Sequence, residues 1–308
     1  MNKGIAPSTP RVSRLIDTNV ELLGESSPEE RAYLHTILTQ CSLPYRRPPE
    51  GTRDYIRENG RASLILTAGY LIDPVTKKAT MVGLPYGVKP RLLMLHLCTK
   101  AVRTKSPHIS IADSMSAFMK ELGLGVRGGA RGTIAPFKEQ LNRLAASRMQ
   151  LMMDFGDHCS VMNPAPLIRK FDVWFPSDPR QRMLWPTEVT LASEFFETLV
   201  DHALPLDPRS IAALQHSARG LDCYTWLAHR LPRVRRRSGD RVSWAALRGQ
   251  FGGESSVPKS FRNRMTEALK QALGVYPAAK VELVEGGVLL RRSPPPIATK
   301  RSYPQIGR

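Results

Sequence analysis

The stretch 258-PKSFRNRMTEALKQALGVYPAAKVELVEGGVLLRR-292 decides how the chain is interpreted. Apolar residues recur every four positions in its first part, which predicts a helix over 258–273 whose core face is Phe261, Met265, Leu269 and Leu273. Two short apolar runs, 279–284 and 287–292, follow around Glu285-Gly286-Gly287, and they predict a β-hairpin. A basic helix followed by a hairpin is how a winged-helix domain ends, with the helix in the major groove and the hairpin beside it.

The face of this predicted helix opposite its apolar stripe carries side chains that suit DNA. Lys259, Asn263, Thr266 and Lys270 lie on that face, and Arg262 lies near its border. Arginine pairs with the edge of guanine and asparagine with that of adenine, whereas lysine neutralises phosphate. An ordinary solvated face is the alternative, and the sequence leaves it open. Further predicted contacts are Lys280, Arg291 and Arg292 with the DNA backbone or minor groove, and Arg233, Arg235, Arg236 and Arg237 with phosphates.

An earlier part of the chain has a similar order of elements without a similar sequence. A helix over 90–105, a short strand over 106–111 and a helix capped by Asp113 or Ser114 precede a glycine-rich turn. A basic helix over 133–146 and an expected hairpin, made of apolar runs 149–155 and 167–175, come next. We therefore expect an α+β protein with two tandem winged-helix domains, in which Arg131, Lys138 and Arg143 also contact DNA.

Turn chemistry and composition predict the domain boundaries. Ser27, Pro28 and Glu30 favour a capped helix start, so residues 1–42 are expected to form an N-terminal arm with one helix that reaches about Cys41. Residues 43–177 are the first predicted domain, in which runs 63–72 and 79–84 form a hairpin. The remaining predictions are a linker at 178–187, a second domain at 188–293 with helices at 193–200, from Asp207, at 218–231 and within 242–251, and a disordered tail at 294–308.

The charge of the chain points to a polyanionic partner. The 308 residues include 45 Lys plus Arg against 27 Asp plus Glu, a net charge of +18. Residues 89–148 hold 11 basic and 3 acidic residues, residues 178–232 hold 5 and 7, and residues 233–308 hold 16 and 5. Two basic regions separated by a slightly acidic one favour two surfaces that face a polyanion. Simple solvation of helix faces is the alternative, although mixed charge would serve that purpose equally well.

No group of residues has the spacing that catalysis needs. The glycines from Gly123 to Gly132 lack the lysine of a nucleotide-binding loop, and the seven histidines form no H-x-H pair. His158 and Cys159 are adjacent, but neighbours on a strand point to opposite faces. We expect no enzymatic activity, no cofactor and no metal. The four cysteines, Cys41, Cys98, Cys159 and Cys223, lie far apart and are expected to be reduced and mostly buried.

The chain has no apolar run long enough to cross a membrane, and its start lacks the apolar core of a secretory signal. We therefore expect a cytoplasmic protein.

Several separate blocks resemble one known family. They are Leu84-Pro85-Tyr86-Gly87, Lys89-Pro90-Arg91, Phe171-Asp172-Val173-Trp174-Phe175-Pro176, Leu184-Trp185-Pro186, the run from Leu221 to Leu231, and Ala279-Lys280-Val281-Glu282. In this order, from about Leu43 to Pro296, the chain resembles plasmid-encoded RepA replication initiators. The resemblance implies a protein that binds repeated sites at a plasmid origin, helps to open the duplex, recruits host replication proteins and represses its own promoter.

We therefore predict a plasmid replication initiator. Its expected partners are double-stranded origin DNA and host initiator and helicase proteins, and a homodimer is left open. A winged-helix transcriptional repressor is the alternative. A chromatin-like or RNA-binding protein without sequence preference is a third class, and it would bind every sequence equally.

Overall fold

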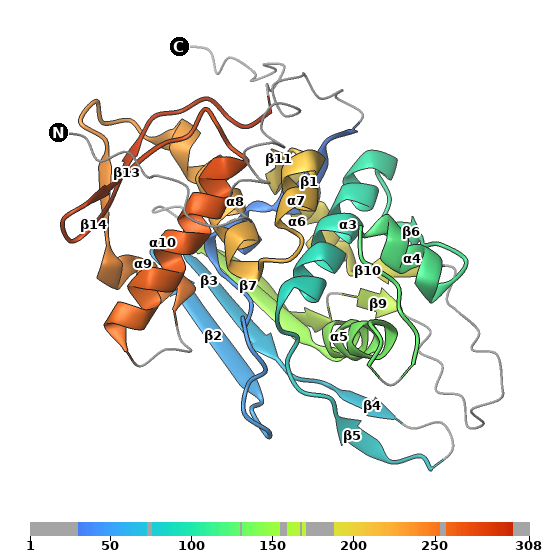
Figure 1. Cartoon of the computed structure of the whole chain (residues 1–308). Coiled ribbons are helices and arrows are strands. Elements are labelled where there is room, and N and C mark those ends of the chain that lie inside the picture. The colour runs from blue at the N-terminus through green and yellow to red at the C-terminus, as the bar shows by residue number, and fades with distance from the viewer. Residues whose placement is uncertain are drawn as a thin grey trace.

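The structure is a computed structural model that describes residues 30–72, 76–129, 131–154, 159–166, 168–170, 188–252 and 257–297. Helices alternate with small antiparallel sheets over these residues, and the α+β class expected from the sequence is confirmed (Figure 1). No helix in this part of the chain is both long enough and apolar enough to cross a membrane.

A first set of elements surrounds a three-stranded antiparallel sheet with the order β6-β10-β9. The helix α5 packs Phe137, Leu141 and Leu144 into the core, as its sequence pattern predicts. Ser114 caps α4 by accepting a hydrogen bond from the backbone amide of Ala117. The elements are α3 (Val88–Thr104), β6 (His108–Ser110), α4 (Met115–Glu121), α5 (Ile134–Ala146), β9 (Ile168–Lys170) and β10 (Glu188–Leu191).

A second set repeats this order around a sheet with the order β12-β14-β13. The helices and the hairpin predicted from residue 218 onward are all present, with bounds that differ by at most a few residues from the prediction. In both sheets the last strand of the set lies between the other two. The elements are α8 (Ala218–Arg230), β12 (Asp240–Ser243), α9 (Trp244–Phe251), α10 (Pro258–Gly274), β13 (Lys280–Val284) and β14 (Gly287–Arg291).

A four-stranded sheet with the order β2-β3-β7-β8 corrects the predicted first hairpin. The strand β7 (Arg148–Asp154) pairs with β8 (Cys159–Pro166) and not with β9, the described part of the run 167–175. On its other edge β7 pairs with β3 (Ala62–Thr67), where buried Leu64 and Leu66 lie opposite Leu151 and Met149. This apolar register draws β7 into a larger sheet, whose outer strand is β2 (Asp54–Asn59).

The predicted linker, 178–187, lies outside the described residues. It connects β9 to β10, two strands of the same sheet. Glu188–Leu191 therefore pair with the first set, although the sequence places them at the start of the second domain. The domain boundaries themselves remain a prediction.

The predicted N-terminal helix is wrong in its central part. Its capped start at Ser27 lies outside the described residues, and Ala32–His35 form a strand, β1, that pairs with β11 (Ala203–Leu206). Of the described residues in this segment, α2 (Thr36–Gln40) forms the α-helix, and His35 caps it because its Nδ1 accepts a hydrogen bond from the amide of Ile37. A pairing partner about 170 residues away overrides the local helix signal here, as tertiary context often does.

The predicted hairpin of runs 63–72 and 79–84 is shorter in the structure, because residues 63–67 belong to β3 and pair with β2 and β7. β4 (Tyr70–Ile72) and β5 (Ala79–Met81) form the hairpin expected around residues 73–78. α6 (Ser193–His202) and α7 (Pro208–Leu214) form the predicted helices, and Asp207 caps α7 by accepting from the amide of Arg209.

A buried ion pair joins α3 of the first set to α8 of the second. Arg91 Nε and Nη2 each donate to a carboxylate oxygen of Asp222 at 2.8 Å. The same guanidinium donates to the backbone carbonyls of Leu43, Pro44 and Gly87 at 2.6 to 3.2 Å. The Arg91 side chain is only 6% exposed, so its charge is balanced by protein groups and not by water.

We expect Asp222→Asn to lower the free energy of unfolding by about 3–5 kcal/mol, because it leaves a buried guanidinium without its counter-charge. Urea unfolding followed by circular dichroism measures this loss. The matched control is Glu282→Gln, which breaks the exposed Arg291–Glu282 pair and should cost less than about 1 kcal/mol. An equal loss of unfolding free energy in the two variants would show that Asp222 does not balance a buried charge.

Three histidines are held neutral by the fold. Burial, followed by the nearby His202, lowers the pKa of His35 to about 3. Burial, followed by neighbouring cations, lowers the pKa of His96 and of His229 to about 4. The unfolded chain takes up these protons near pH 6.5 and the folded chain does not, so stability falls as the pH drops below about 6.5.

We expect His35→Asn, which keeps an acceptor for the α2 cap, to remove part of this pH dependence. Between pH 7 and pH 5 the wild-type protein should lose about 2 kcal/mol through His35 alone, and the variant should not lose that share. Urea unfolding at both pH values tests this. The same pH dependence in the two proteins would show that His35 is protonated in the folded state.

Candidate nucleic-acid interface

The helix α10 is positioned by its apolar stripe. Pro258 lies in its first turn, where no backbone hydrogen bond is lost, and Phe261, Met265 and Leu269 are at most 3% exposed. These side chains pack toward α8, and the Cys223 and Met265 sulfur atoms are 3.9 Å apart. Because the buried stripe fixes the rotation of the helix about its axis, it also fixes which residues face outward.

The outward face of α10 contains the residues predicted from the sequence. Lys259, Arg262 and Asn263 are exposed, and Thr266 and Lys270 are half-buried. The neighbouring Arg264 is different because its guanidinium turns back to Ser260, with Nη2 donating to Oγ at 2.6 Å. The structure therefore brings the five predicted α10 residues onto one side of the helix.

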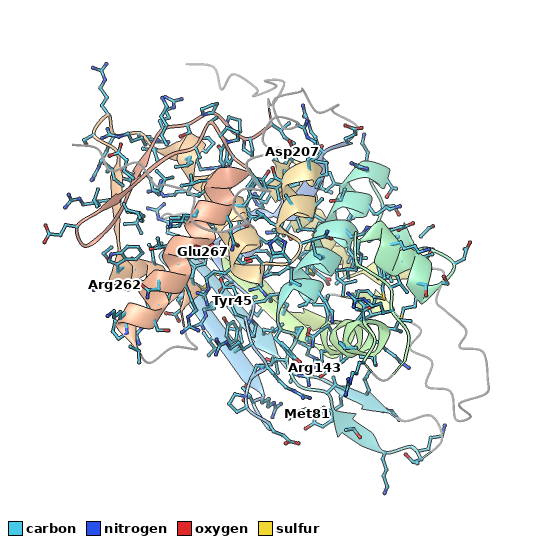
Figure 2. The ribbon with its side chains drawn as sticks, viewed as in Figure 1. Tyr45, Met81, Arg143, Asp207, Arg262 and Glu267 are labelled. Carbon is cyan, nitrogen blue, oxygen red and sulfur yellow. The ribbon has the colours of Figure 1, made fainter. Side chains whose placement is uncertain are left out.

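Glu267 is a candidate that the sequence prediction missed. It is half-buried and lies one turn after Asn263 on the same side of α10, and Figure 2 labels it together with Arg262. A carboxylate in such a position can accept a hydrogen bond from the amino group of cytosine. Its spacing of four residues from Asn263 indicates that it lies on the same side of the helix. The prediction considered mainly basic residues and therefore missed it.

The hairpin β13–β14 and the loop before β12 supply further cations. Lys280 and Arg292 are exposed, whereas Arg291 is half-buried and donates from Nε to Glu282 Oε1 at 2.8 Å. Arg233 donates to the carbonyl of His229 at 2.6 Å. The three exposed arginines between Arg233 and β12 are Arg235, Arg236 and Arg237.

In the first set, the structure places the predicted contact Arg143 inside the fold. Its side chain is only 10% exposed, its Nη1 donates to the carbonyl of Leu84 at 3.0 Å, and its Nε donates to Glu139 at 3.1 Å. The segment leading from β5 to α3 folds over this side of α5, and the Arg143 guanidinium lies over the ring of Tyr86. Arg131 is exposed and Lys138 is half-buried, so both stay candidates.

The buried thiols carry no reactive signature. Cys41, Cys98 and Cys223 are free and buried, and burial raises the pKa of Cys41 and of Cys98 to about 12. His158 and the side chain of Cys159 lie outside what the structure describes. Within the described ranges, no three His, Cys, Asp or Glu residues come together in a way that could hold a metal ion.

The plasmid-encoded RepA protein family matches residues 84–246, just over half of the chain. The chain belongs to this family. Membership confirms the resemblance drawn from the sequence and supports a role in the initiation of plasmid replication. The matched region runs from the segment before α3 into α9, so α10 and the β13–β14 hairpin lie beyond it.

Other comparisons add little to the RepA assignment. No curated protein sequence shows significant similarity to the chain. Among solved structures, the crystal structure of domains 2 and 3 of RctB matches with a TM-score of 0.48 at 11% identity. That match covers 82% of this chain and 95% of the RctB chain.

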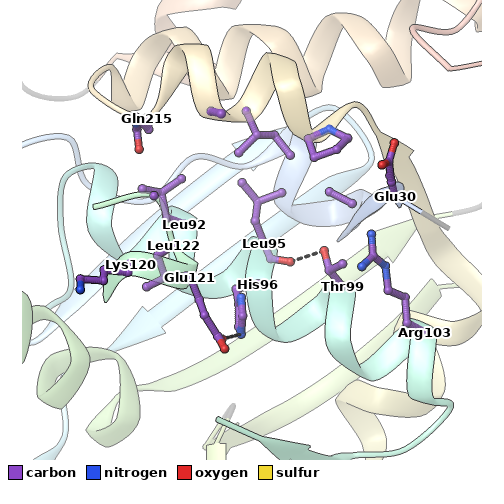
Figure 3. A pocket seen from close by; sticks show the side chains of 15 residues that line it. Glu30, Leu92, Leu95, His96, Thr99, Arg103, Lys120, Glu121, Leu122 and Gln215 are labelled. Carbon is purple, nitrogen blue, oxygen red and sulfur yellow. Dashed lines mark hydrogen bonds and ion pairs between the residues drawn. The ribbon is translucent and has the colours of Figure 1, made fainter. Parts of the chain in front are cut away.

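This RepA family member also has an amphipathic pocket of about 300 Å³ among residues of α3, α4 and α7 (Figure 3). Leu92, Leu95 and Ile211 form its apolar part, and His96 Nε2 lies 3.6 Å from Glu121 Oε2 at its side. None of the predicted DNA contacts lines the pocket. It is therefore a feature separate from the candidate interface.

We expect Arg143→Ala to act on folding. Removing the guanidinium leaves the buried carbonyl of Leu84 without this donor, which should lower the free energy of unfolding by about 1–3 kcal/mol. The control is Arg131→Ala, an exposed arginine just before the start of α5, and it should change stability by less than about 0.5 kcal/mol. Urea unfolding measures both. An unchanged stability in the Arg143 variant would show that the side chain is free to reach a ligand.

Proposed function

We propose that this RepA family member initiates plasmid replication by binding repeated double-stranded sites at the plasmid origin. One observation carries the proposal: α10 exposes Lys259, Arg262 and Asn263 on the side opposite its buried stripe. These residue types suit phosphate, guanine and adenine in that order. Family membership supports the initiation role, and the exposed face of α10 supports sequence-specific DNA binding.

Two tandem winged-helix units are the architecture that we propose for this binding. Each set of elements runs helix, strand, helix, helix, strand, strand, and in each sheet the last strand lies between the other two. In winged-helix domains the third helix enters the major groove, and the closing hairpin flanks it. In the second set these are α10 and β13–β14, so we assign base reading to α10.

In the proposed complex each class of contact has its own residues. Arg262 reads guanine, Asn263 reads adenine, and Glu267 accepts from cytosine. Thr266, which lies near Asn263 and Glu267 on the helix, contacts a base edge or a phosphate. The remaining contacts are with the DNA backbone and fix the register of the protein on the duplex: Lys259, Lys270, Lys280, Arg291, Arg292, Arg235, Arg236 and Arg237.

The first set has a different part in this proposal. Arg131 and Lys138 contact phosphates, while Arg143 holds the segment before α3 and does not reach DNA. The two sets together would hold the duplex at two places. Strain imposed between these places, together with host initiator and helicase proteins, would favour the opening of nearby A·T-rich steps.

The protein would perform this role in the cytoplasm with no catalytic group, cofactor or metal of its own. Host enzymes would supply the chemistry of replication.

A plasmid that carries the matching origin tests the initiator proposal against the repressor alternative. We expect replication to stop when the gene for this protein is removed and to resume when it is supplied in trans. Persistence of the plasmid without the protein would overturn the initiator role. Footprinting of the protein on the same origin identifies the protected site for the measurements below.

We expect Arg262→Ala and Asn263→Ala each to relax the preference for particular bases, at a cost of about 1–3 kcal/mol. Arg236→Ala should weaken binding to all sequences alike. It should also lower the slope of log affinity against log salt concentration by about one, which corresponds to one lost phosphate contact. Competition between the protected fragment and scrambled DNA at fixed salt measures both effects. If the Arg262 and Asn263 variants both keep full discrimination, α10 is not the reading helix.

A further inference from the structure

The hairpin formed by β4 and β5 is the feature that the DNA-binding proposal leaves unused. Both strands are three residues long, and among the described strands they pair only with each other, with Tyr70 opposite Met81 and Ile72 opposite Ala79. Figure 1 shows the hairpin projecting beyond α5 at the lower right of the molecule. An isolated two-stranded ribbon of this kind is only marginally stable in water, so exposed apolar side chains on it indicate a role other than stability.

Two large apolar side chains point outward from this ribbon. Tyr70 is 58% exposed and Ile72 is 63% exposed, and being two residues apart on one strand they share a face. Their cross-strand partners extend the same face, since Ala79 is exposed and Met81 is half-buried. Leu71 is half-buried on the opposite face. An apolar stripe on a projecting ribbon marks a surface that meets a partner.

The base of the ribbon is fixed to the end of α5 by backbone contact. Gly69 lies so close to the carbonyl of Ala146 that any side chain at position 69 would collide with it. The amide of Val82 donates to the carbonyl of Gly69 at 3.1 Å and closes the hairpin at this point. The base of the ribbon is therefore held against α5. A displacement of the ribbon would move this helix of the first set as well.

The charge around the ribbon favours a polyanion. Lys77 and Lys78 are exposed beside the turn, and Lys77 has a positive φ of 55°. At the base, Arg47 and Met81 of β5 line a polar cavity of about 590 Å³. Arg47 is 66% exposed, and its Nη2 lies 3.2 Å from Glu139, an exchangeable surface contact. Apolar tips flanked by cations are what minor-groove wedges present to DNA.

We propose that the β4–β5 ribbon enters the minor groove beside the bound site and that Tyr70 and Ile72 wedge apart a base step. Lys77, Lys78 and Arg47 contact the flanking phosphates. The proposal rests on the proposed DNA-binding function and names the part of the chain that distorts the duplex. Side chains inserted in this way unstack one step and kink the DNA toward the major groove. Flexible A·T-containing steps are the least costly ones to distort.

The test separates distortion from binding. The probe is the origin fragment that the wild-type protein protects, with 2-aminopurine placed in turn at each flanking position. We expect the full-length wild-type protein to raise the fluorescence at one flanking step. The double variant Tyr70→Ser/Ile72→Ser should bind the fragment within about threefold of wild type, because the favourable contacts of a wedge are largely offset by the cost of unstacking the bases. It should lose most of the fluorescence rise.

Two further variants act as controls. Val200→Ser removes an apolar side chain that is 53% exposed on α6, outside the ribbon, and should leave the distortion unchanged. Lys77→Ala/Lys78→Ala should weaken binding to all sequences and lower the salt slope by up to about two. All the replaced side chains are exposed, so each variant is expected to fold. Circular dichroism checks that it does.

The outcomes are distinct. Sequence-specific binding with full distortion in the Tyr70→Ser/Ile72→Ser variant would overturn the ribbon proposal alone. A defect seen only when host replication proteins are added would also overturn it, because the ribbon would then be a protein-docking element. Equal binding of wild-type protein to the protected and scrambled fragments would overturn the proposed function, and the ribbon proposal with it.

Discussion

The buried Arg91–Asp222 pair is the contact on which the arrangement of the two sets of elements depends. It joins α3 to α8, the first helices of the two sets, and its guanidinium also gathers the carbonyls of Leu43, Pro44 and Gly87. Burial alone would lower the pKa of Arg91, but the charge and hydrogen bonds of Asp222 raise it well above its usual value. A pair this deeply buried contributes little net stability, yet it penalises any arrangement that separates the partners.

The same pair is connected to α10 through a short series of contacts. The guanidiniums of Arg91 and Arg219 lie over the ring of Tyr45, at 4.7 and 4.0 Å. Arg219 donates to the carbonyl of Phe251 at 2.8 Å, where α9 ends. The Arg219 guanidinium also lies 5.9 Å from the centre of the Phe261 ring, so contacts that begin on α3 reach α10, whose position is set as well by its own apolar stripe. Such a network couples the two sets, because a shift of one changes the hydrogen bonds of the other.

Local patterns predicted the second set well and the first set less completely. The α10 stripe and the β13–β14 hairpin are encoded by nearby residues, so periodicity and turn chemistry were sufficient. The pairing of β1 with β11 depends on residues far apart in the sequence, and no local signal announces it. Arg143 shows the same limit at the candidate site: its position on the helix looked solvent-facing, but the carbonyl of Leu84 and the ring of Tyr86 cover it. Burial by a distant segment cannot be read from a helical pattern alone.

This difference changes what the net charge of +18 means. The basic excess of residues 89–148 includes Arg91 and Arg143, whose largely buried side chains pair with Asp222 and Glu139 and donate to backbone carbonyls. The excess from residue 233 onward includes Arg235, Arg236, Lys259 and Arg262, all exposed. Charge used inside the fold cannot attract a polyanion, so the two basic regions are unequal despite their similar composition. In the proposed complex, the second set would therefore present most of the recognition surface. The first set, with its internal arginines and the projecting β4–β5 ribbon, would in that complex hold and distort the duplex and would not read it.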